Sequence, residues 1–352
     1  VKGGRWVKMS KRHKNYASPM EAMNKYGADA LRLYMLDSPV THADPLKFNE
    51  SAILDKGKFL AQWYNCFQFL EQEIRMLQTL GVHADARLDT INILSGPLNT
   101  YDNWILSELY TMVQQVQGAY DGYRLYQVVP LVIRFEELFS KWYINLSKLK
   151  MKGPAIRSPM PTSSDASQEM ALATLWKVLE VFSVIMSPIT PFMSERIYLG
   201  LTNLTTATTQ PSVHMVQLAE LIPTIKFDAR AGSITANLVD TVMSVRALKT
   251  QAGQSARLKS RLLIIRHRDA GYLRDLQTLE TELLTAVKVA EVAYEQIPMN
   301  ETVEYHIEFN RALLGKMVKV RVQEVQAELT KQPASAFCGL TEITVCADEQ
   351  VI

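Results

Sequence analysis

The sequence is poor in cysteine, and its cysteines lie far apart. Its 352 residues contain only three, Cys66, Cys338 and Cys346. No two of them form a Cys-x-x-Cys pair. This odd, sparse count argues against a disulfide framework and against a zinc site built on paired cysteines. The composition therefore fits a protein of a reducing compartment.

Long apolar runs are also missing. A membrane-spanning helix needs about 20 consecutive apolar residues. The most apolar stretch, residues 178–193, is interrupted by Glu180, Pro188 and Pro191. No secretory signal peptide is visible. We therefore expect neither a membrane span nor a membrane partner.

An excess of one charge is absent as well, since the sequence contains 38 Lys and Arg and 36 Asp and Glu. The total charge of +2 thus gives no indication of a polyanionic partner. Two stretches, residues 1–16 and 241–268, nevertheless contain basic residues and no acid. Such stretches produce local positive surface that attracts phosphates. A solvated face of Lys and Arg is the alternative reading, and charge pattern alone does not decide between them.

Hydrophobic spacing divides the chain into three predicted parts. Residues 1–46 are short and rich in turns. Residues 47–228 contain apolar stripes with spacings of three and four, which are typical of long helices. Four such helices with short connections predict an antiparallel bundle. They are expected at residues 50–80, from residue 102, at 125–149 and at 172–186.

The last predicted part, residues 229–352, changes period. A helix is expected at residues 233–248 and a short buried strand at 262–265. Residues 303–309 alternate between apolar and polar, which indicates a half-exposed strand. Two further helices are expected near residues 273–287 and 318–329. This part should form a small α+β domain, which makes the whole chain mainly α-helical.

One short loop has the composition of a phosphate-binding site. Lys8-Met9-Ser10-Lys11-Arg12 places two lysines three residues apart in an irregular segment. Both ammonium groups can point at one anion, and backbone N–H groups can join them. Such a loop suits a reaction in which negative charge grows on a departing pyrophosphate. A basic loop of five residues is more often a solvated surface loop than a phosphate site, so the residues around it must decide between the two.

The context of this loop resembles class I aminoacyl-tRNA synthetases. The loop is similar to their KMSKS signature, and Arg12 in place of the second serine looks like the isoleucyl branch. The resemblance continues through Ser38-Pro39-Val40, Asn103-Trp104-Ile105-Leu106-Ser107, Tyr123-Arg124-Leu125-Tyr126, Trp142-Tyr143-Ile144 and Ser187-Pro188-Ile189-Thr190-Pro191. It extends from about residue 8 to 200 and weakens from 230 to 330. The tryptophans and tyrosines of these motifs fall mostly on apolar stripes, so we predict that most are core residues.

This resemblance implies a function and a set of site residues. The sequence is expected to be the C-terminal part of a cytoplasmic isoleucyl-tRNA synthetase, which joins isoleucine to its tRNA with ATP and Mg²⁺. Lys8 and Lys11 would be catalytic, and Ser10 would join them in binding the ATP phosphates. The helical bundle would be the anticodon-binding domain. The basic stretch of the last part supplies the candidate tRNA-backbone contacts Arg246, Lys249, Arg257 and Arg261.

Some family features are missing. Asn145 and Lys148 stand where the family often has arginines, which puts a bidentate phosphate contact there in doubt. None of the six histidines forms the His-x-Gly-His signature of the ATP site. The domain that hydrolyses misacylated tRNA is also absent. We therefore predict that this chain alone makes no aminoacyl-adenylate. We also expect it to be monomeric and, from its sparse cysteines, to lack a zinc site.

Three alternatives remain open. The chain could be a non-catalytic tRNA-binding helical module, or a part of the related valyl or leucyl enzymes. It could also be a helical scaffold for protein contacts, although a scaffold does not explain the loop at residues 8–12.

Overall fold

A computed structural model describes the chain over residues 9, 12, 18–42, 44–46, 48–79, 93–94, 96, 98–152, 166–204, 210–253, 255, 258–297, 342–347 and 350–351. Contacts divide it into two compact units, Val1–Thr235 and Ala236–Ile352. The division falls inside helix α11, Ala229–Gln251. The three-part division at residues 46 and 228 stays a prediction.

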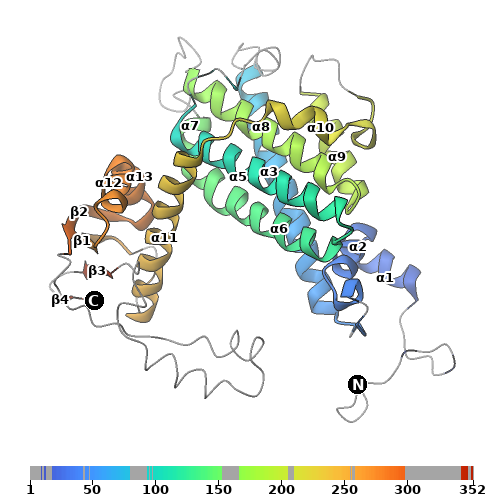
Figure 1. Ribbon diagram of the computed structural model, residues 1–352, viewed down its shortest axis with the longest axis horizontal. Coiled ribbons are helices and arrows are strands. Elements are labelled where there is room, and N and C mark those ends of the chain that lie inside the picture. The colour runs from blue at the N-terminus through green and yellow to red at the C-terminus, as the bar shows by residue number, and fades with distance from the viewer. Residues whose placement is uncertain are drawn as a thin grey trace. The chain divides into compact units, whose positions relative to one another are not determined.

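The first unit is helical (Figure 1). Its long helices follow the apolar stripes of the sequence, because each stripe needs a partner surface to bury. They pack on one another and confirm the predicted bundle. The helices of this unit are α1 (Pro19–Tyr26), α2 (Ala28–Leu36), α3 (Glu50–Thr79), α5 (Thr100–Asp121), α6 (Leu125–Glu137), α7 (Ile144–Lys152), α8 (Ala166–Met186), α9 (Pro191–Thr202) and α10 (Leu218–Leu221).

Short turns of other helix types connect these elements. The π-helical segment η2, Leu138–Tyr143, lies between α6 and α7, so that residues 125–152 form one continuous helical stretch. Pro130 lies inside α6. The remaining short segments are η1 (Pro39–His42), η4 (Val213–Met215) and η5 (Ile222–Thr224).

Aromatic side chains form the centre of the bundle. Trp63 of α3 meets Phe182 of α8 edge to face, with ring centroids 5.1 Å apart. Phe135 lies 5.5 Å from the same Phe182 ring. Trp104 and Tyr143 are also fully buried. Trp104 and Tyr143 are thus core residues as predicted, whereas Tyr126 and Trp142 are only half-buried and Tyr123 is exposed, so the prediction for the family motifs is confirmed only in part.

Buried polar groups connect the bundle helices at defined points. Asn99 caps α5 by accepting hydrogen bonds from the backbone N–H groups of Tyr101 and Asp102. The buried Asp102 in turn accepts a 2.8 Å bond from the Tyr143 hydroxyl. Desolvation raises the pKa of Asp102 to about 6, although the bond from Tyr143 opposes the shift. These bonds fix the register of α5 against η2, since a buried carboxyl without partners would be costly.

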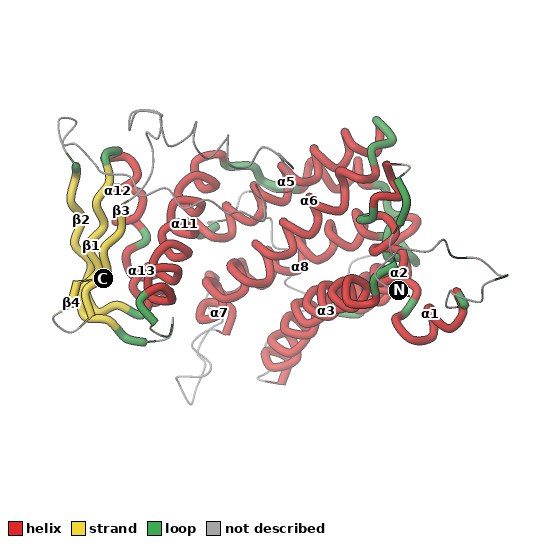
Figure 2. The backbone as a smooth tube through the Cα atoms, turned by 90° about the horizontal axis from the view of Figure 1, so that it is seen from below, coloured by secondary structure: helices red, strands yellow, loops and turns green. Residues whose placement is uncertain are grey.

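The second unit contains a four-stranded sheet (Figure 2). β1 (Ser260–His267) pairs in parallel with β2 (Val289–Gln296) and antiparallel with β3 (Glu342–Ala347), and β4 (Gln350–Val351) pairs with β3. The helices α12 (Ala270–Thr278) and α13 (Glu280–Val287) connect β1 to β2. A βαβ connection of this kind is what parallel pairing requires.

The outcome for the second unit is mixed. The strand predicted at 262–265 is confirmed within β1, and the helix at 233–248 within α11. The single helix expected at 273–287 is wrong in detail, because the chain breaks into two helices at Leu279, whose ψ of 29° is not helical. The elements expected at 303–309 and 318–329 lie outside the described residues.

Candidate functional site

The predicted phosphate loop falls largely outside the described part of the chain. Lys8, Ser10 and Lys11 are not among the described residues, so their predicted roles remain predictions. Met9, between them, is described and is 48% exposed. The part of the site that the structure describes in detail is the segment directly after this loop.

This segment folds into two short helices. Ser18 begins α1 with a capping box, in which the Glu21 carboxylate accepts a bond from the Ser18 backbone N–H at 3.2 Å. Pro19 occupies the first turn, where its missing N–H costs nothing. Gly27 then has a φ of 84°, a conformation that suits glycine, and lets α2 start at once.

Two charged residues of α2 attach it to the bundle. Arg32 donates from Nε to the Ile189 carbonyl at 2.9 Å and from a terminal nitrogen to the Pro188 carbonyl at 2.8 Å. Asp29 accepts bonds from the backbone N–H groups of Phe192 at 3.4 Å and Met193 at 2.7 Å. The arginine thus binds carbonyls that follow α8, and the aspartate binds the free N–H groups that begin α9. We call this pair of contacts the α2 clamp.

The α2 clamp suits the charges of the helix ends. An anion is favourable at a helix N-terminus, and a cation is favourable near the last carbonyls of a helix. Burial raises the pKa of Asp29, while the N–H groups of Met193 and Phe192 and the charge of Arg32 oppose that rise. The partial cancellation indicates a carboxylate that is desolvated but well supplied with donors.

Further contacts attach the same segment to α3. Lys56 of α3 and Asp37 at the end of α2 form an ion pair at 2.5 Å. The Tyr34 hydroxyl accepts a bond from the Asn49 backbone N–H at 3.1 Å. The described part of residues 18–49, which we call the bracket, is therefore attached both to residues 188–193 and to α3, and the predicted phosphate loop precedes it in the sequence.

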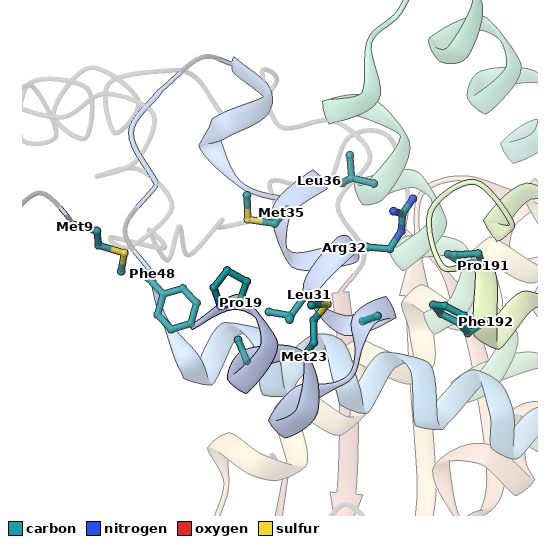
Figure 3. A pocket seen from close by; sticks show the side chains of 12 residues that line it. Met9, Pro19, Met23, Leu31, Arg32, Met35, Leu36, Phe48, Pro191 and Phe192 are labelled. Carbon is teal, nitrogen blue, oxygen red and sulfur yellow. The ribbon is translucent and has the colours of Figure 1, made fainter. Parts of the chain in front are cut away.

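An apolar cavity of about 870 Å³ opens on this bracket (Figure 3). Met9 and Phe48 lie at one rim, and Pro191 and Phe192 lie at the opposite one. Arg32 is its single charged lining residue, and its guanidinium is engaged in the α2 clamp. The other lining residues are Pro19, Ala22, Met23, Ala28, Leu31, Met35 and Leu36.

The basic residues predicted for tRNA contact have different environments. Arg246 and Arg261 are exposed. A terminal nitrogen of Arg246 lies 3.4 Å from the Ala286 carbonyl. Arg257 is outside the described residues. Of the four basic residues predicted to contact tRNA, Arg246 and Arg261 therefore have described side chains that a tRNA could reach.

Lys249 departs from that prediction. Its side chain is fully buried, and its ammonium donates to the carbonyls of Leu258 at 2.9 Å and Val287 at 2.8 Å. Burial lowers the pKa of this lysine. An ammonium enclosed in this way does not reach a tRNA phosphate, and its role is to join three segments of the second unit. The charge pattern could not reveal this, because it does not distinguish buried from exposed lysines.

A second basic group lies in the bundle at the end of α7. Lys148 is exposed, and Asn145 beside it donates to the Lys141 carbonyl of its own helix at 2.6 Å. Lys150 lies 5.5 Å from the centre of the Tyr101 ring. Lys152 follows in the last turn, where a cation is favourable. The positions that the family often fills with arginine are therefore accessible in this chain.

Two other kinds of site are not found among the described residues. No group of three or more His, Cys, Asp or Glu side chains there is arranged to hold a metal ion. No described helix is both long enough and apolar enough to cross a membrane.

Comparisons with known proteins identify the relatives of the chain. Residues 2–47 match the family model of the class I tRNA synthetases (I, L, M and V), and residues 102–264 match the anticodon-binding domain of tRNA ligase. The cytoplasmic isoleucine–tRNA ligase of Saccharomyces cerevisiae is 31% identical over 333 residues, which cover 92% of this chain and 30% of that protein. The chain is a relative of the isoleucine–tRNA ligases.

Other isoleucine–tRNA ligases agree with this relationship. The cytoplasmic ligase of Caenorhabditis elegans is 31% identical over 351 residues, covering 97% of this chain and 29% of the ligase. The ligase of Bdellovibrio bacteriovorus is 30% identical over 327 residues, covering 91% and 28%. The chain thus spans about 30% of the length of the ligases that it matches. The resemblance inferred from the sequence motifs is confirmed.

One solved structure resembles the chain weakly. The LeuRS of Agrobacterium radiobacter, in a ternary complex with tRNA, aligns over 93% of this chain and 29% of its own at 14% identity and a TM-score of 0.39. A score this low supports no conclusion.

The structure also reveals residues that the sequence did not single out. Asp29 and Arg32 lie one helical turn apart, which is a visible signal, but surface pairs have the same spacing. Their partners are backbone groups about 160 positions away, and no local pattern points to them.

Proposed function

We propose that this chain is the tRNA-binding part of an isoleucine–tRNA ligase. In this proposal the whole enzyme activates isoleucine with ATP and transfers it to its tRNA. The observation that carries the proposal is the order of matches along one chain. A segment related to the class I synthetases is followed by an anticodon-binding match, and isoleucine–tRNA ligases align over almost the whole length.

The bracket and the bundle then have separate tasks. The bundle binds tRNA, and residues 18–49 transmit its position to the signature loop through the α2 clamp. A loop that is misplaced by 1 Å can lose much of its catalytic effect, so a rigid link is valuable. We propose the division into residues 1–46 for the signature loop and a segment that contacts the tRNA stem, 47–228 for the anticodon-binding bundle and 229–352 for a further tRNA-contacting domain.

The chemistry proposed for the loop follows from its residue types. Lys8 and Lys11 would place two ammonium groups at the ATP phosphates and stabilise the charge of the departing pyrophosphate. Ser10 would add a hydrogen bond to the same phosphates. Mg²⁺ would enter with ATP and help to neutralise its phosphates. The described residues offer no site for it, so we assign it no protein ligands.

Partners and location are proposed on the same basis. The partner is the isoleucine acceptor tRNA, and several relatives are cytoplasmic ligases, which supports a cytoplasmic location. We propose that the chain is monomeric and that it has no zinc site.

The experiment that tests the catalytic part uses the whole enzyme. Lys11→Ala should slow isoleucine-dependent ATP–pyrophosphate exchange by at least about 100-fold, or roughly 3 kcal/mol of barrier. Lys14→Ala, outside the five-residue loop, is the matched control. A change of less than about threefold for Lys11→Ala would refute the role. The isolated chain should show no exchange, and a rate near that of the whole enzyme would refute this.

Amino-acid specificity needs its own test. Acylation of purified tRNA by the whole enzyme should occur with isoleucine and its tRNA. Faster acylation with valine or leucine and their tRNAs would transfer the chain to those relatives. Tight tRNA binding without any acylation would favour a non-catalytic module.

A further inference from the structure

Tyr123 occupies an unusual backbone conformation in the turn between α5 and α6. Its φ is 54°, and it shares a positive φ with only one other described non-glycine residue, Lys288. A side chain makes this left-handed region costly, so glycine normally fills it. Gly122 precedes Tyr123 and has a φ of −88°, so the glycine lies one residue too early to relieve the cost.

Backbone hydrogen bonds show that this turn requires the left-handed residue. The Arg124 N–H donates to the Ala119 carbonyl at 2.8 Å, and the Tyr123 N–H donates to the Tyr120 carbonyl at 3.0 Å. This pair of bonds is the Schellman arrangement that ends a helix, and its left-handed position is that of Tyr123. The fold itself would be served better by glycine at this position.

The Tyr123 ring contributes little packing to the fold. It is 93% exposed, more than any other large apolar or aromatic side chain in the described part of the chain. Buried tyrosines such as Tyr101 and Tyr143 form part of the core instead. A costly backbone that presents an exposed ring points to a contact outside the chain, since strained residues persist where function requires them.

The surroundings of Tyr123 suit RNA. Arg124 is exposed beside it, and its guanidinium is held by the Gly118 carbonyl at 3.0 Å, with a second nitrogen close to Gly122. An exposed ring next to a fixed guanidinium is a stacking platform with a cation, which is how proteins bind unpaired bases. The turn also lies within the part that matches the anticodon-binding domain.

We propose that Tyr123 contacts the bound tRNA by stacking on an unpaired base or its ribose. This proposal rests on the proposed tRNA-binding function and adds a residue to it. The turn lies near α2, because the Tyr120 hydroxyl at the end of α5 lies 3.5 Å from the Ile185 carbonyl and Arg32 of α2 binds the nearby Pro188 carbonyl. The contact would therefore lie beside the bracket.

The strain at this position allows a decisive experiment, because structural and functional roles predict opposite changes. Tyr123→Gly and Tyr123→Asn both accept the left-handed conformation. Each should leave the Tm unchanged or raise it, while the Kd for isoleucine tRNA rises about tenfold. Tyr123→Phe keeps the ring and should stay within about threefold of the parent chain. Met215→Ala, another exposed residue of the same unit, is the control and should change neither quantity.

Each contrary outcome has a distinct meaning. If the parent chain binds tRNA and Tyr123→Gly binds equally well, the Tyr123 contact is refuted while the proposed function stands. If the parent chain itself binds no tRNA, the proposed function fails and this inference fails with it. A Tm that falls in Tyr123→Gly would show that the ring serves the fold. Unchanged tRNA binding with loss of self-association in sedimentation would make the ring a protein contact and overturn the proposal.

Discussion

Two charged side chains of opposite sign, Asp29 and Arg32, attach α2 to the residues around the start of α9. In the second unit a single buried ammonium, that of Lys249, joins α11 to two other segments. Asp29 accepts hydrogen bonds from backbone N–H groups, Arg32 donates hydrogen bonds to backbone carbonyls, and Arg32 remains exposed to solvent. Lys249 is enclosed, and its ammonium binds two backbone carbonyls. The comparison teaches that similar contacts between a charged side chain and backbone groups can have very different costs when they are lost.

The buried ammonium gives the largest expected effect. Lys249→Ala should destabilise the second unit by about 3 kcal/mol, because it leaves two carbonyls without their donor and opens a cavity. Hydrogen exchange of the β1 and β2 amides, together with urea unfolding, measures the loss. Lys259→Ala, an exposed lysine nearby, should stay within about 0.5 kcal/mol. Equal effects of the two substitutions would refute the structural role of Lys249.

The bundle also contains a buried ionisable group, the Glu136 carboxyl, and its effect on stability should depend on pH. Glu136 is 1% exposed, and one of its carboxylate oxygens has no hydrogen-bond partner among the described residues. Desolvation raises its pKa to about 7, against a weaker opposing bond from Ser140. Between pH 4.5 and 7 the folded protein therefore keeps a proton that the unfolded chain releases, so stability falls as the pH rises.

Glu136→Gln should remove this loss. Above pH 7 the variant should exceed the parent by roughly 2 to 3 kcal/mol, and the difference should vanish towards pH 4. Asp102, whose pKa burial raises to about 6, acts in the same direction and leaves a smaller slope in the variant. Denaturant unfolding of the bundle from pH 4 to 8 checks this, with the exposed Glu137→Gln as control. A parent stability that rises over this range would contradict the account.

The paired contact should be less costly to break. Arg32→Ala removes two bonds to carbonyls of the α8–α9 turn, which contribute about 1 to 2 kcal/mol together. The loss should appear as faster hydrogen exchange of α2, with the remainder of the bundle unaffected. Arg230→Ala, an exposed arginine of the same unit, is the control. Uniform destabilisation of all bundle helices would show that α2 does not respond separately.

The smallest effect on stability is expected one helical turn before Lys249. Arg246→Ala should leave the Tm within about 2 °C, since surface substitutions change stability little. The affinity for tRNA should fall severalfold, and the salt dependence of binding should lose about one phosphate contact. Titration of labelled tRNA at several salt concentrations measures both. An unchanged salt slope would remove Arg246 from the interface.

The sequence predicted the bundle because long helices display their buried stripe in every turn. Leu60, Trp63, Phe67 and Leu70 are all buried, as their spacing indicated. β2 was missed, since its charged residues Glu291 and Glu295 interrupt the alternation that marks a strand. Its pairing with β1 is a long-range contact that local pattern does not encode.

The candidate site was predictable only in part, for a related reason. The signature loop is a contiguous motif and could be read directly, whereas the α2 clamp joins charged side chains to distant backbone groups. Lys249 was predicted to contact tRNA because the sequence shows that a residue is charged but not whether its side chain is buried. Tyr123 was noticed as part of a motif, but its exposure and left-handed backbone depend on how the α5–α6 turn closes.

Binding of the chain to isoleucine tRNA over a range of salt concentrations tests the central claim most directly. We predict a Kd that weakens by at least about tenfold between 50 and 200 mM salt, and a preference for this tRNA over valine and leucine tRNAs at every concentration. Absence of binding at low salt by the folded chain, or a Kd that does not respond to salt, would contradict the account.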